Sequence, residues 1–353
     1  MRRVTTLAAA VLAGALVLTS CGGDSGDDDA DTTPKGDDTS SSAPASDVKV
    51  GLAYDIGGRG DQSFNDAAAA GLDKAADEFG VETNEAEAAN GEPESAKEER
   101  LRALASAGFN PVIAVGFAYS GAVKKVAGEL PDTQFAIIDD AAATGDNIAN
   151  LLFAEEQGSF LVGAAAALKS KTGNVGFVGG VDVPLIHKFE AGFEAGAKAV
   201  NPDITVQVKY LTQPPDFSGF GDPAKGKTAA AGMFDKGADV VYQAAGGSGG
   251  GVFEAAQDAG GYAIGVDSDQ YNTADPKVRD VIITSMLKKV DVAVYDFISS
   301  VVDGNFTAGP VTYDLEKDGV GYSTSGGQID DITSKLDEYK AQIIDGSITV
   351  PTE

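Results

Sequence analysis

The sequence predicts an α/β fold with two doubly wound lobes, each a parallel sheet with helices on both faces. Strand-like and helix-like segments alternate along the chain from residue 48 onward, and this alternation is typical of parallel sheets covered by helices. Apolar residues make up 43% of the chain and charged residues 23%, a composition that supports a globular core. Residues 48–353 are too many for a single sheet of this kind, so we expect two lobes.

The first half of this segment contains two predicted helices and three predicted strands. Apolar residues recur at helical spacing in residues 64–79, where Leu72 and Phe79 lie on one stripe. A second helix is expected at residues 121–130 and stops before Pro131. The strands are expected at residues 48–54, 112–115 and 135–138.

The same alternation restarts after about residue 156. Helices are expected at residues 160–171, about 189–200, 223–237 and 252–260. Strands are expected at residues 174–178, 204–211, 239–242, 262–266 and 281–287. The two series correspond to two lobes. We expect the first lobe to comprise residues 48–155 and about 267–303, and the second to comprise residues 156–266 and about 304–353.

Polar, aromatic and glycine residues follow the predicted strands, at the edge where open parallel sheets bind their ligands. These residues are Asp55 and the turn of residues 57–65, Gly116 and Phe117, Asp139 and Asp140, residues 246–248, residues 267–270, and Lys288 and Lys289. They supply carboxylates, amides, aromatic rings, backbone N–H groups and an ammonium. They lack a nucleophile with a base and an orienting group, so the sequence favours a binding site over an enzyme.

Seven motifs occur in order along the same part of the chain. They are DQSFN at residues 61–65, FAIID at 135–139, SKTGNVGFVGG at 170–180, FEAGF at 189–193, DPAKGK at 222–227, GVDSDQ at 265–270 and LKKVD at 287–291. Over roughly residues 48–325 the chain thereby resembles the basic membrane protein (BMP) family of bacterial lipoproteins, the substrate-binding proteins of nucleoside ABC transporters. The resemblance implies a type I periplasmic-binding-protein fold, in which two doubly wound parallel-sheet lobes joined by a hinge close around one nucleoside.

The resemblance also implies which residues would contact the base. Phe64 and Phe220 would stack on the two faces of a purine ring, one from each lobe, and Asn65 and Asp139 would bind its polar edges. Ser63 belongs to the same turn as Phe64 and is expected in the ligand-binding set. Because a neutral base has two π faces and several donors, a pair of aromatic rings with carboxylates suits it chemically.

The sugar would be bound by a second set of residues that the resemblance implies. Asp55, Asp267 and Lys288 would bind the ribose hydroxyls, and Gly246 would let the backbone approach the ligand without a Cβ in the way. Asp139 and Lys288 are each followed by a residue of the same type, so either member of each pair could face the ligand.

Residues 221–228 match the phosphate-binding loop pattern G-x-x-x-x-G-K-[ST]. A loop of that class directly follows a strand, whereas residues 212–220 separate this one from its strand. Asp222 and Pro223 are instead typical of the N-cap and first residue of a helix. We therefore expect no nucleotide hydrolysis at this loop.

The N-terminus indicates where the protein resides. Two arginines precede an apolar stretch, residues 4–18, which has the length of a signal-peptide core and is too short to span a membrane. The stretch leads to Cys21, the only cysteine in the chain, after small residues as in a bacterial lipobox. We expect a signal peptide at residues 1–20 and, over residues 21–47, a lipidated Cys21 with a disordered acidic tether. The lipid would hold the protein at the extracytoplasmic face of the cell membrane.

The charge and the rare residues exclude several partners. The chain has 26 Lys and Arg against 54 Asp and Glu, a formal net charge of −28, and so it repels the phosphate backbone of nucleic acids. One cysteine cannot form an internal disulfide, and one cysteine with one histidine does not make a zinc cluster. We expect a monomer with no cofactor and no metal.

These observations together predict a lipid-anchored solute-binding protein that captures nucleosides, of the purine type such as guanosine, inosine or adenosine, for uptake by an ABC permease. The two-lobed fold hosts many ligands, so a sugar or another small polar ligand remains an alternative, as does a ligand sensor. A nucleoside-cleaving enzyme would need a poised acid or a metal site, which the sequence does not display.

Overall fold

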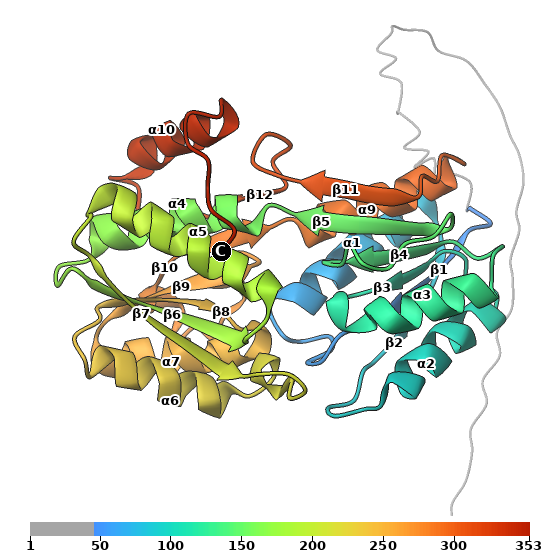
Figure 1. Ribbon diagram of the computed structural model, residues 1–353, viewed down its shortest axis with the longest axis horizontal. Helices are drawn as coiled ribbons and strands as arrows, with labels where there is room; N and C mark the ends of the chain where they lie inside the picture. The colour runs from blue at the N-terminus through green and yellow to red at the C-terminus, as the bar shows by residue number, and fades with distance from the viewer. Residues whose placement is uncertain (1–45) are drawn as a thin grey trace, which may run out of the picture. The chain divides into compact units, whose positions relative to one another are not determined.

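Two six-stranded sheets form the cores of two α/β lobes in the computed structural model (Figure 1). The structure describes residues 46–353, so the expected signal peptide, the lipid site at Cys21 and nearly all of the tether lie outside the described residues. All strand pairs are parallel except β10 with β12. This architecture confirms the predicted pair of doubly wound lobes.

The first lobe has the strand order β11-β5-β4-β3-β1-β2. Its strands are β1 (Lys49–Ala53), β2 (Glu82–Ala86), β3 (Val112–Ala114), β4 (Phe135–Ile138), β5 (Ile148–Phe153) and β11 (Gly309–Tyr313). Its helices are α1 (Phe64–Phe79), α2 (Glu94–Ser106), α3 (Ser120–Glu129) and α9 (Val290–Val302). Helix α1 packs against α9, and α2 packs against α3. The α2–α3 pair buries one cluster of apolar side chains against the first sheet, whereas side chains of α1 and α9 belong to a larger cluster that continues into the second lobe.

The second lobe repeats this order with β12-β10-β9-β8-β6-β7. Its strands are β6 (Asn174–Val181), β7 (Thr205–Thr212), β8 (Val240–Ala244), β9 (Tyr262–Asp267), β10 (Ile282–Lys288) and β12 (Val320–Tyr322). Its helices are α4 (Glu155–Lys169), α5 (Pro184–Val200), α6 (Pro223–Phe234), α7 (Gly249–Ala259), α8 (Gln270–Thr273) and α10 (Thr333–Ile344). Helix α4 packs against α5, and α6 packs against α7. No helix within residues 46–353 is long and apolar enough to cross a membrane.

The chain passes between the lobes three times, from β5 to α4, from β10 to α9 and from β11 to β12. These crossings change the expected division of the C-terminal part. Strand β10 pairs with β9 and belongs to the second sheet, although residues 267–303 were expected in the first lobe. Strand β11 pairs with β5 and belongs to the first sheet, although residues 304–353 were expected in the second lobe. An apolar strand does not encode which sheet it joins, because that choice is made by the crossing connections.

Glycines allow α4 and α5 to lie in direct backbone contact. A Cβ atom on Gly196 would lie 1.9 Å from the carbonyl oxygen of Phe160, and one on Gly192 would lie 2.1 Å from that of Glu156. Gly163 on α4 faces the carbonyl of Phe193 in the same way. This close backbone packing holds α4 and α5 together as one unit. The first turns of both helices lie at the site described next.

Candidate functional site

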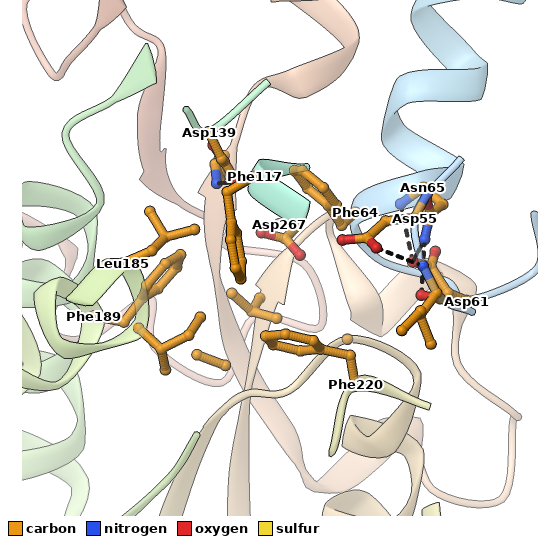
Figure 2. A pocket seen from close by; sticks show the side chains of 16 residues that line it. Asp55, Asp61, Phe64, Asn65, Phe117, Asp139, Leu185, Phe189, Phe220 and Asp267 are labelled. Atoms are coloured by element: carbon orange, nitrogen blue, oxygen red, sulfur yellow. Dashed lines mark hydrogen bonds and ion pairs between the residues drawn. The ribbon is translucent and has the colours of Figure 1, made fainter. Parts of the chain in front are cut away.

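A cavity lies between the lobes at the carboxyl ends of the strands (Figure 2). The cavity has a volume of ≈ 60 Å³, or ≈ 560 Å³ when all the empty space among its side chains and the solvent at its mouth are counted. The lining residues come from both lobes. They are Asp55, Ile56, Asp61, Phe64, Asn65, Phe117, Asp139, Leu185, Ile186, Phe189, Phe220, Ala244, Gly246, Val266, Asp267 and Lys288.

Asp61 and Asn65 shape one end of the cavity. The Asp61 carboxylate accepts hydrogen bonds from the backbone N–H groups of Ser63, Asn65 and Asp66 at 2.9, 2.9 and 3.1 Å, so it caps the N-terminus of α1. The Asn65 side chain donates to Asp61 at 3.0 Å and accepts from the backbone N–H of Asp55 at 3.0 Å. These bonds use most of the capacity of the amide, which is 2% exposed. Asn65 therefore holds the Asp55–Asp61 turn in place.

A buried ionic group lies at the other end. The Lys288 ammonium donates to Asp139 Oδ2 at 2.5 Å and lies 3.3 Å from Glu155 Oε1. The side chains of Lys288, Asp139 and Glu155 are 2%, 4% and 1% exposed. Asp139 Oδ1 is also buried and has no hydrogen-bond partner among residues 46–353. Because buried polar atoms are almost always paired, this oxygen is a candidate acceptor for a ligand.

Asp267 completes the polar lining and links the lobes. Its Oδ2 accepts a hydrogen bond from the Ser63 hydroxyl at 2.6 Å, and Ser268 donates to the Ser63 carbonyl at 3.2 Å. Gln270 donates to the Gln62 carbonyl at 2.9 Å. Ser63 is fully buried by these contacts and does not line the cavity. These hydrogen bonds join the turn before α1 in the first lobe to the end of β9 and the residues that follow it in the second.

Burial makes the cavity carboxylates less acidic than usual. It raises the pKa of Asp55 and of Asp267 to about 6, and for Asp267 the charge of Lys288 opposes the rise. Burial also raises the pKa of Asp139 above its ordinary value, against the attraction of Lys288. The pKa of Asp61 is raised by burial too, while its hydrogen bonds lower it. Carboxylates in this state gain most from a ligand that donates hydrogen bonds to them.

Aromatic rings lie between the two polar ends. Figure 2 shows Phe64 and Phe220 between the Asp61 end and the Asp139 end, with Leu185 and Phe189 on the side away from Asp61. Phe64 begins α1 in the first lobe, whereas Phe220 ends a 3₁₀ turn, residues 218–220, in the second. Phe220 packs on Gly180, where an added Cβ would lie 2.4 Å from its ring.

Eight of the nine residues expected in the binding set line the cavity, and Ser63 is the exception. Asp139 and Lys288 line it, whereas Asp140 and Lys289 do not. The Asp140 carboxylate instead accepts from the backbone N–H of Ala143 at 2.7 Å in its own loop. The loop that matches the phosphate-binding pattern leads into α6, where Asp222 caps the helix by accepting from the Lys225 N–H at 3.1 Å.

Sequence reasoning missed two parts of the site. The apolar wall from α5, with Leu185, Ile186 and Phe189, was not expected, because the helix was predicted to start only near residue 189. Pro184 at the first helical position was the signal that could have placed the start earlier. Glu155, which pairs with Lys288 from outside the lining, gave no signal in the sequence. Within residues 46–353, no group of three or more His, Cys, Asp or Glu side chains is placed to hold a metal ion.

Comparison with known proteins identifies relatives over nearly the whole chain. The chain is 36% identical to a CD4+ T-cell-stimulating antigen of Listeria innocua, with 97% of this chain and 96% of the relative covered. It is 34% identical to a protein of Lactococcus lactis named ABC transporter nucleoside-binding protein BmpA, with 100% and 99% covered. It is also 34% identical to basic membrane protein A of Borreliella burgdorferi, with 86% and 88% covered.

Solved structures and a family comparison agree with these relatives. A solute-binding protein of an ABC transporter system from Aeropyrum pernix K1 superposes with a TM-score of 0.75 at 31% identity, covering 87% of this chain and 94% of that one. A similar protein from Conexibacter woesei, at 24% identity, shares the fold with a TM-score of 0.70, covering 86% and 99%. Residues 48–353 match the Bmp family, described as ABC transporter substrate-binding protein PnrA-like. The chain therefore belongs to the Bmp family of ABC transporter substrate-binding proteins.

Proposed function

We propose that this substrate-binding protein captures purine nucleosides outside the cytoplasmic membrane, where a lipid on Cys21 anchors it, and delivers them to an ABC permease. The observation that carries the proposal is the pair of rings, Phe64 and Phe220, which reach the cavity from opposite lobes between two polar ends. A nucleoside has a flat base for such rings and hydroxyl groups for such carboxylates. The name of the Lactococcus relative, a nucleoside-binding protein, supports the same ligand class.

The base would lie between Phe64 and Phe220, with its polar edge toward Asp55 and Asp61. Asp55 thereby moves from the expected sugar-binding set to the base-binding set, because Asn65 links it to Asp61 at this end of the cavity. Stacking between aromatic rings contributes roughly 0.5–1.5 kcal/mol beyond the burial of area. Asn65 would support this end without reading the base, because its amide is engaged with Asp55 and Asp61. In this arrangement Asn65 acts on the ligand through its neighbours, which differs from the role expected from the family resemblance.

The ribose would lie at the end formed by Asp139, Lys288 and Asp267. We assign Asp139 to the sugar-binding set, although it was expected to bind the base. Its Oδ2 accepts a hydrogen bond from Lys288 at 2.5 Å, so a ligand group at this place would contact both Asp139 and Lys288. Its unpartnered Oδ1 would accept a hydrogen bond from a ribose hydroxyl. Hydrogen bonds to charged groups contribute roughly 1.5–3 kcal/mol each, which suits capture of a dilute solute.

Binding would favour the closed arrangement of the lobes, and the closed form would dock on the permease as a monomer. Ser63 and Gln62 already contact Asp267, Ser268 and Gln270 across the lobes, so a ligand that bridges the cavity adds to these contacts. A ligand shifts such an equilibrium only by the difference in its affinity for the two forms. Here that difference comes from groups that both lobes contribute.

The test is calorimetry on protein that has been unfolded, freed of retained ligand and refolded. Guanosine, inosine and adenosine should bind, with free ribose much weaker because it lacks a base to stack. A folded, ligand-free sample that responds to no nucleoside would overturn the proposal, and tighter binding of ribose would favour the sugar alternative. Incubation with inosine should leave it intact, since release of hypoxanthine would indicate an enzyme.

A further inference from the structure

We propose that Glu155 is a positioning residue for the ligand site, which aims the Lys288 ammonium so that Asp139 keeps one carboxylate oxygen free for a ligand hydroxyl. This inference rests on the proposed nucleoside function and deepens it. Glu155 does not line the cavity, and its side chain is 1% exposed. A carboxylate buried to this degree is costly unless it is paired, so its partners indicate what it does.

The two oxygens of Glu155 face two different lysines. Oε1 lies 3.3 Å from the Lys288 ammonium, and Oε2 accepts from Lys188 Nζ at 3.2 Å. Lys188 is 34% exposed, whereas Lys288 is 2% exposed. Glu155 therefore connects a partly exposed lysine to the lysine inside the cavity. With Asp139, it supplies the second of two carboxylates around the inner ammonium.

The ammonium of Lys288 has three N–H donors and no acceptor. One donor goes to Asp139 Oδ2 at 2.5 Å, and Glu155 Oε1 lies 3.3 Å from the same nitrogen. Without Glu155, Asp139 would be the only carboxylate of the described residues within ion-pair distance of the ammonium. The N–H donors of Lys288 would then form hydrogen bonds with both carboxylate oxygens of Asp139, including Oδ1, which has no hydrogen-bond partner among the described residues. Glu155 thus preserves the acceptor that the ligand needs.

Aromatic rings restrict the ammonium further. It lies 5.0 Å from the ring centres of Phe64 and Phe153 and 5.5 Å from that of Phe189. These distances are within reach of cation–π attraction. The rings come from α1, β5 and α5, so both lobes surround the charge. The two carboxylates, of Asp139 and Glu155, therefore determine the direction in which the ammonium points.

The position of Glu155 in the chain suits this role. Glu155 is the first residue of α4, directly after the crossing from β5, and Lys288 is the last residue of β10, directly before the crossing to α9. The ion pair therefore joins two of the three segments that connect the lobes. It keeps the ammonium in one place relative to the hinge, while Asp139 approaches from the first lobe.

The test compares Glu155→Gln with Glu156→Gln in the full chain purified in detergent and freed of ligand. The neighbouring Glu156 has no ion pair with Lys288 and is the matched control. The two probes are inosine and 2′,3′-dideoxyinosine, which has the base but lacks the ribose 2′ and 3′ hydroxyls. Glu155→Gln should weaken inosine binding by roughly 10-fold or more and dideoxyinosine binding by less than about 2-fold. Glu156→Gln should change neither affinity.

Two outcomes would overturn the inference. Equal weakening for both probes would mean that Glu155 only supports the structure, and unchanged inosine binding would mean that it does not act on the site. If Glu155→Gln does not fold, Glu155→Asp keeps the charge with a shorter reach and should show a smaller, hydroxyl-dependent loss. Failure of the wild-type protein to bind inosine would instead contradict the proposed function, so the two failures are distinguishable.

Discussion

Asp139 and Asp267 occupy equivalent places in the two lobes. Asp139 follows β4 and Asp267 ends β9, the third strands in the two sheet orders. Both have φ of 64°, the left-handed region that non-glycine residues occupy at a cost, with Asp and Asn the most tolerant. In each lobe this backbone turn follows the strand at the cavity edge. Two aspartates with a strained backbone at matched positions indicate a functional constraint.

The first prediction concerns the charge of Asp139. Asp139→Asn should weaken nucleoside binding by roughly 10-fold or more, because a charge-assisted hydrogen bond becomes a neutral one. Asparagine tolerates the left-handed backbone, so the loop should keep its shape. Calorimetry with inosine measures the change. Asp140→Asn is the control, since Asp140 faces its own loop, and an equal loss in that variant would refute the assignment.

The second prediction concerns the stacking ring of Phe220. Phe220→Leu keeps an apolar side chain but removes the π face, so nucleoside affinity should fall roughly 2- to 10-fold. Phe234 is half-buried and packs on Gly261 outside the cavity, much as Phe220 packs on Gly180. Phe234→Leu should therefore leave affinity unchanged. Titration of both variants with guanosine decides the matter, and an unaltered affinity in Phe220→Leu would exclude stacking.

At the scale of elements, three helix pairs approach through glycines. Besides α4 with α5, Gly71 of α1 faces the Asp291 carbonyl on α9, and Gly251 of α7 faces the Pro223 carbonyl on α6. In each pair a Cβ would lie within 2.4 Å of a backbone oxygen. These glycines therefore cost some intrinsic helix propensity but allow close backbone packing. The pair α4–α5 also carries Glu155 and the apolar wall of the cavity.

This packing gives the third prediction. Gly196→Ala should destabilise the protein by about 1–3 kcal/mol, because the new methyl group would force α4 and α5 apart. Gly232→Ala on α6 should be neutral or stabilising by up to about 1 kcal/mol, since a Cβ there meets nothing within 4 Å. Urea unfolding of both variants without ligand gives the comparison. Similar effects in the two variants would contradict the packing argument.

Elements with clear apolar periodicity could be predicted, and polar or context-dependent ones could not. Helix α1 and strand β4 occur at the predicted residues. The sequence predicts no element at β2 or α2, because β2 is a half-exposed edge strand and α2 buries only Leu101 and Leu104. Helix α9 is rich in β-branched residues, and its packing on α1 overrides their weak helix propensity.

The same reasons explain which parts of the site could be predicted. Residues that follow clear strands, such as Asp139, Asp267 and Lys288, could be placed at one sheet edge by a general rule of open α/β sheets. Family resemblance was needed to add Phe220, which follows no strand directly. Glu155 could not be predicted, since its role depends on two crossing segments that meet only in the folded chain.

For the whole molecule, the equal strand order of the two sheets places two similar sets of strand ends face to face. The cavity between them collects carboxylates from both lobes, within a chain whose formal net charge is −28. Charges on the surface are screened by salt over about 10 Å at 0.1 M, whereas charges inside the cavity are screened far less. The salt dependence of binding should therefore report mainly on the surface charge, whereas the charge effects that persist at high salt should report on the cavity.

The fourth prediction is that acid stabilises the ligand-free protein and weakens its binding. Burial raises the pKa of Asp55 and Asp267 to about 6 from 3.8. A carboxyl whose pKa is higher in the folded protein stabilises the fold at pH values below its pKa in the unfolded chain, 3.8. This stabilisation is lost as the pH rises through about 6. The Tm without ligand should therefore increase from pH 8 to pH 5, and Asp267→Asn should flatten this trend. The Tm increase caused by inosine should shrink over the same range, because protonated carboxyls accept fewer hydrogen bonds. A ligand-free Tm that falls toward pH 5 would contradict the linkage.

The last prediction is that the cavity rejects nucleotides by charge. A phosphate near the buried carboxylates adds a repulsion of about 2 kcal/mol per pair of charges at 7 Å in an effective dielectric of 20. Inosine 5′-monophosphate should therefore bind roughly 100-fold more weakly than inosine. Calorimetry at 20 and 500 mM NaCl separates two origins of this difference. Repulsion by the surface charge would disappear at high salt, whereas repulsion inside the cavity would persist there and would decrease in Asp139→Asn. Equal affinity for the two ligands at low salt would show that the acidic lining does not select against phosphate.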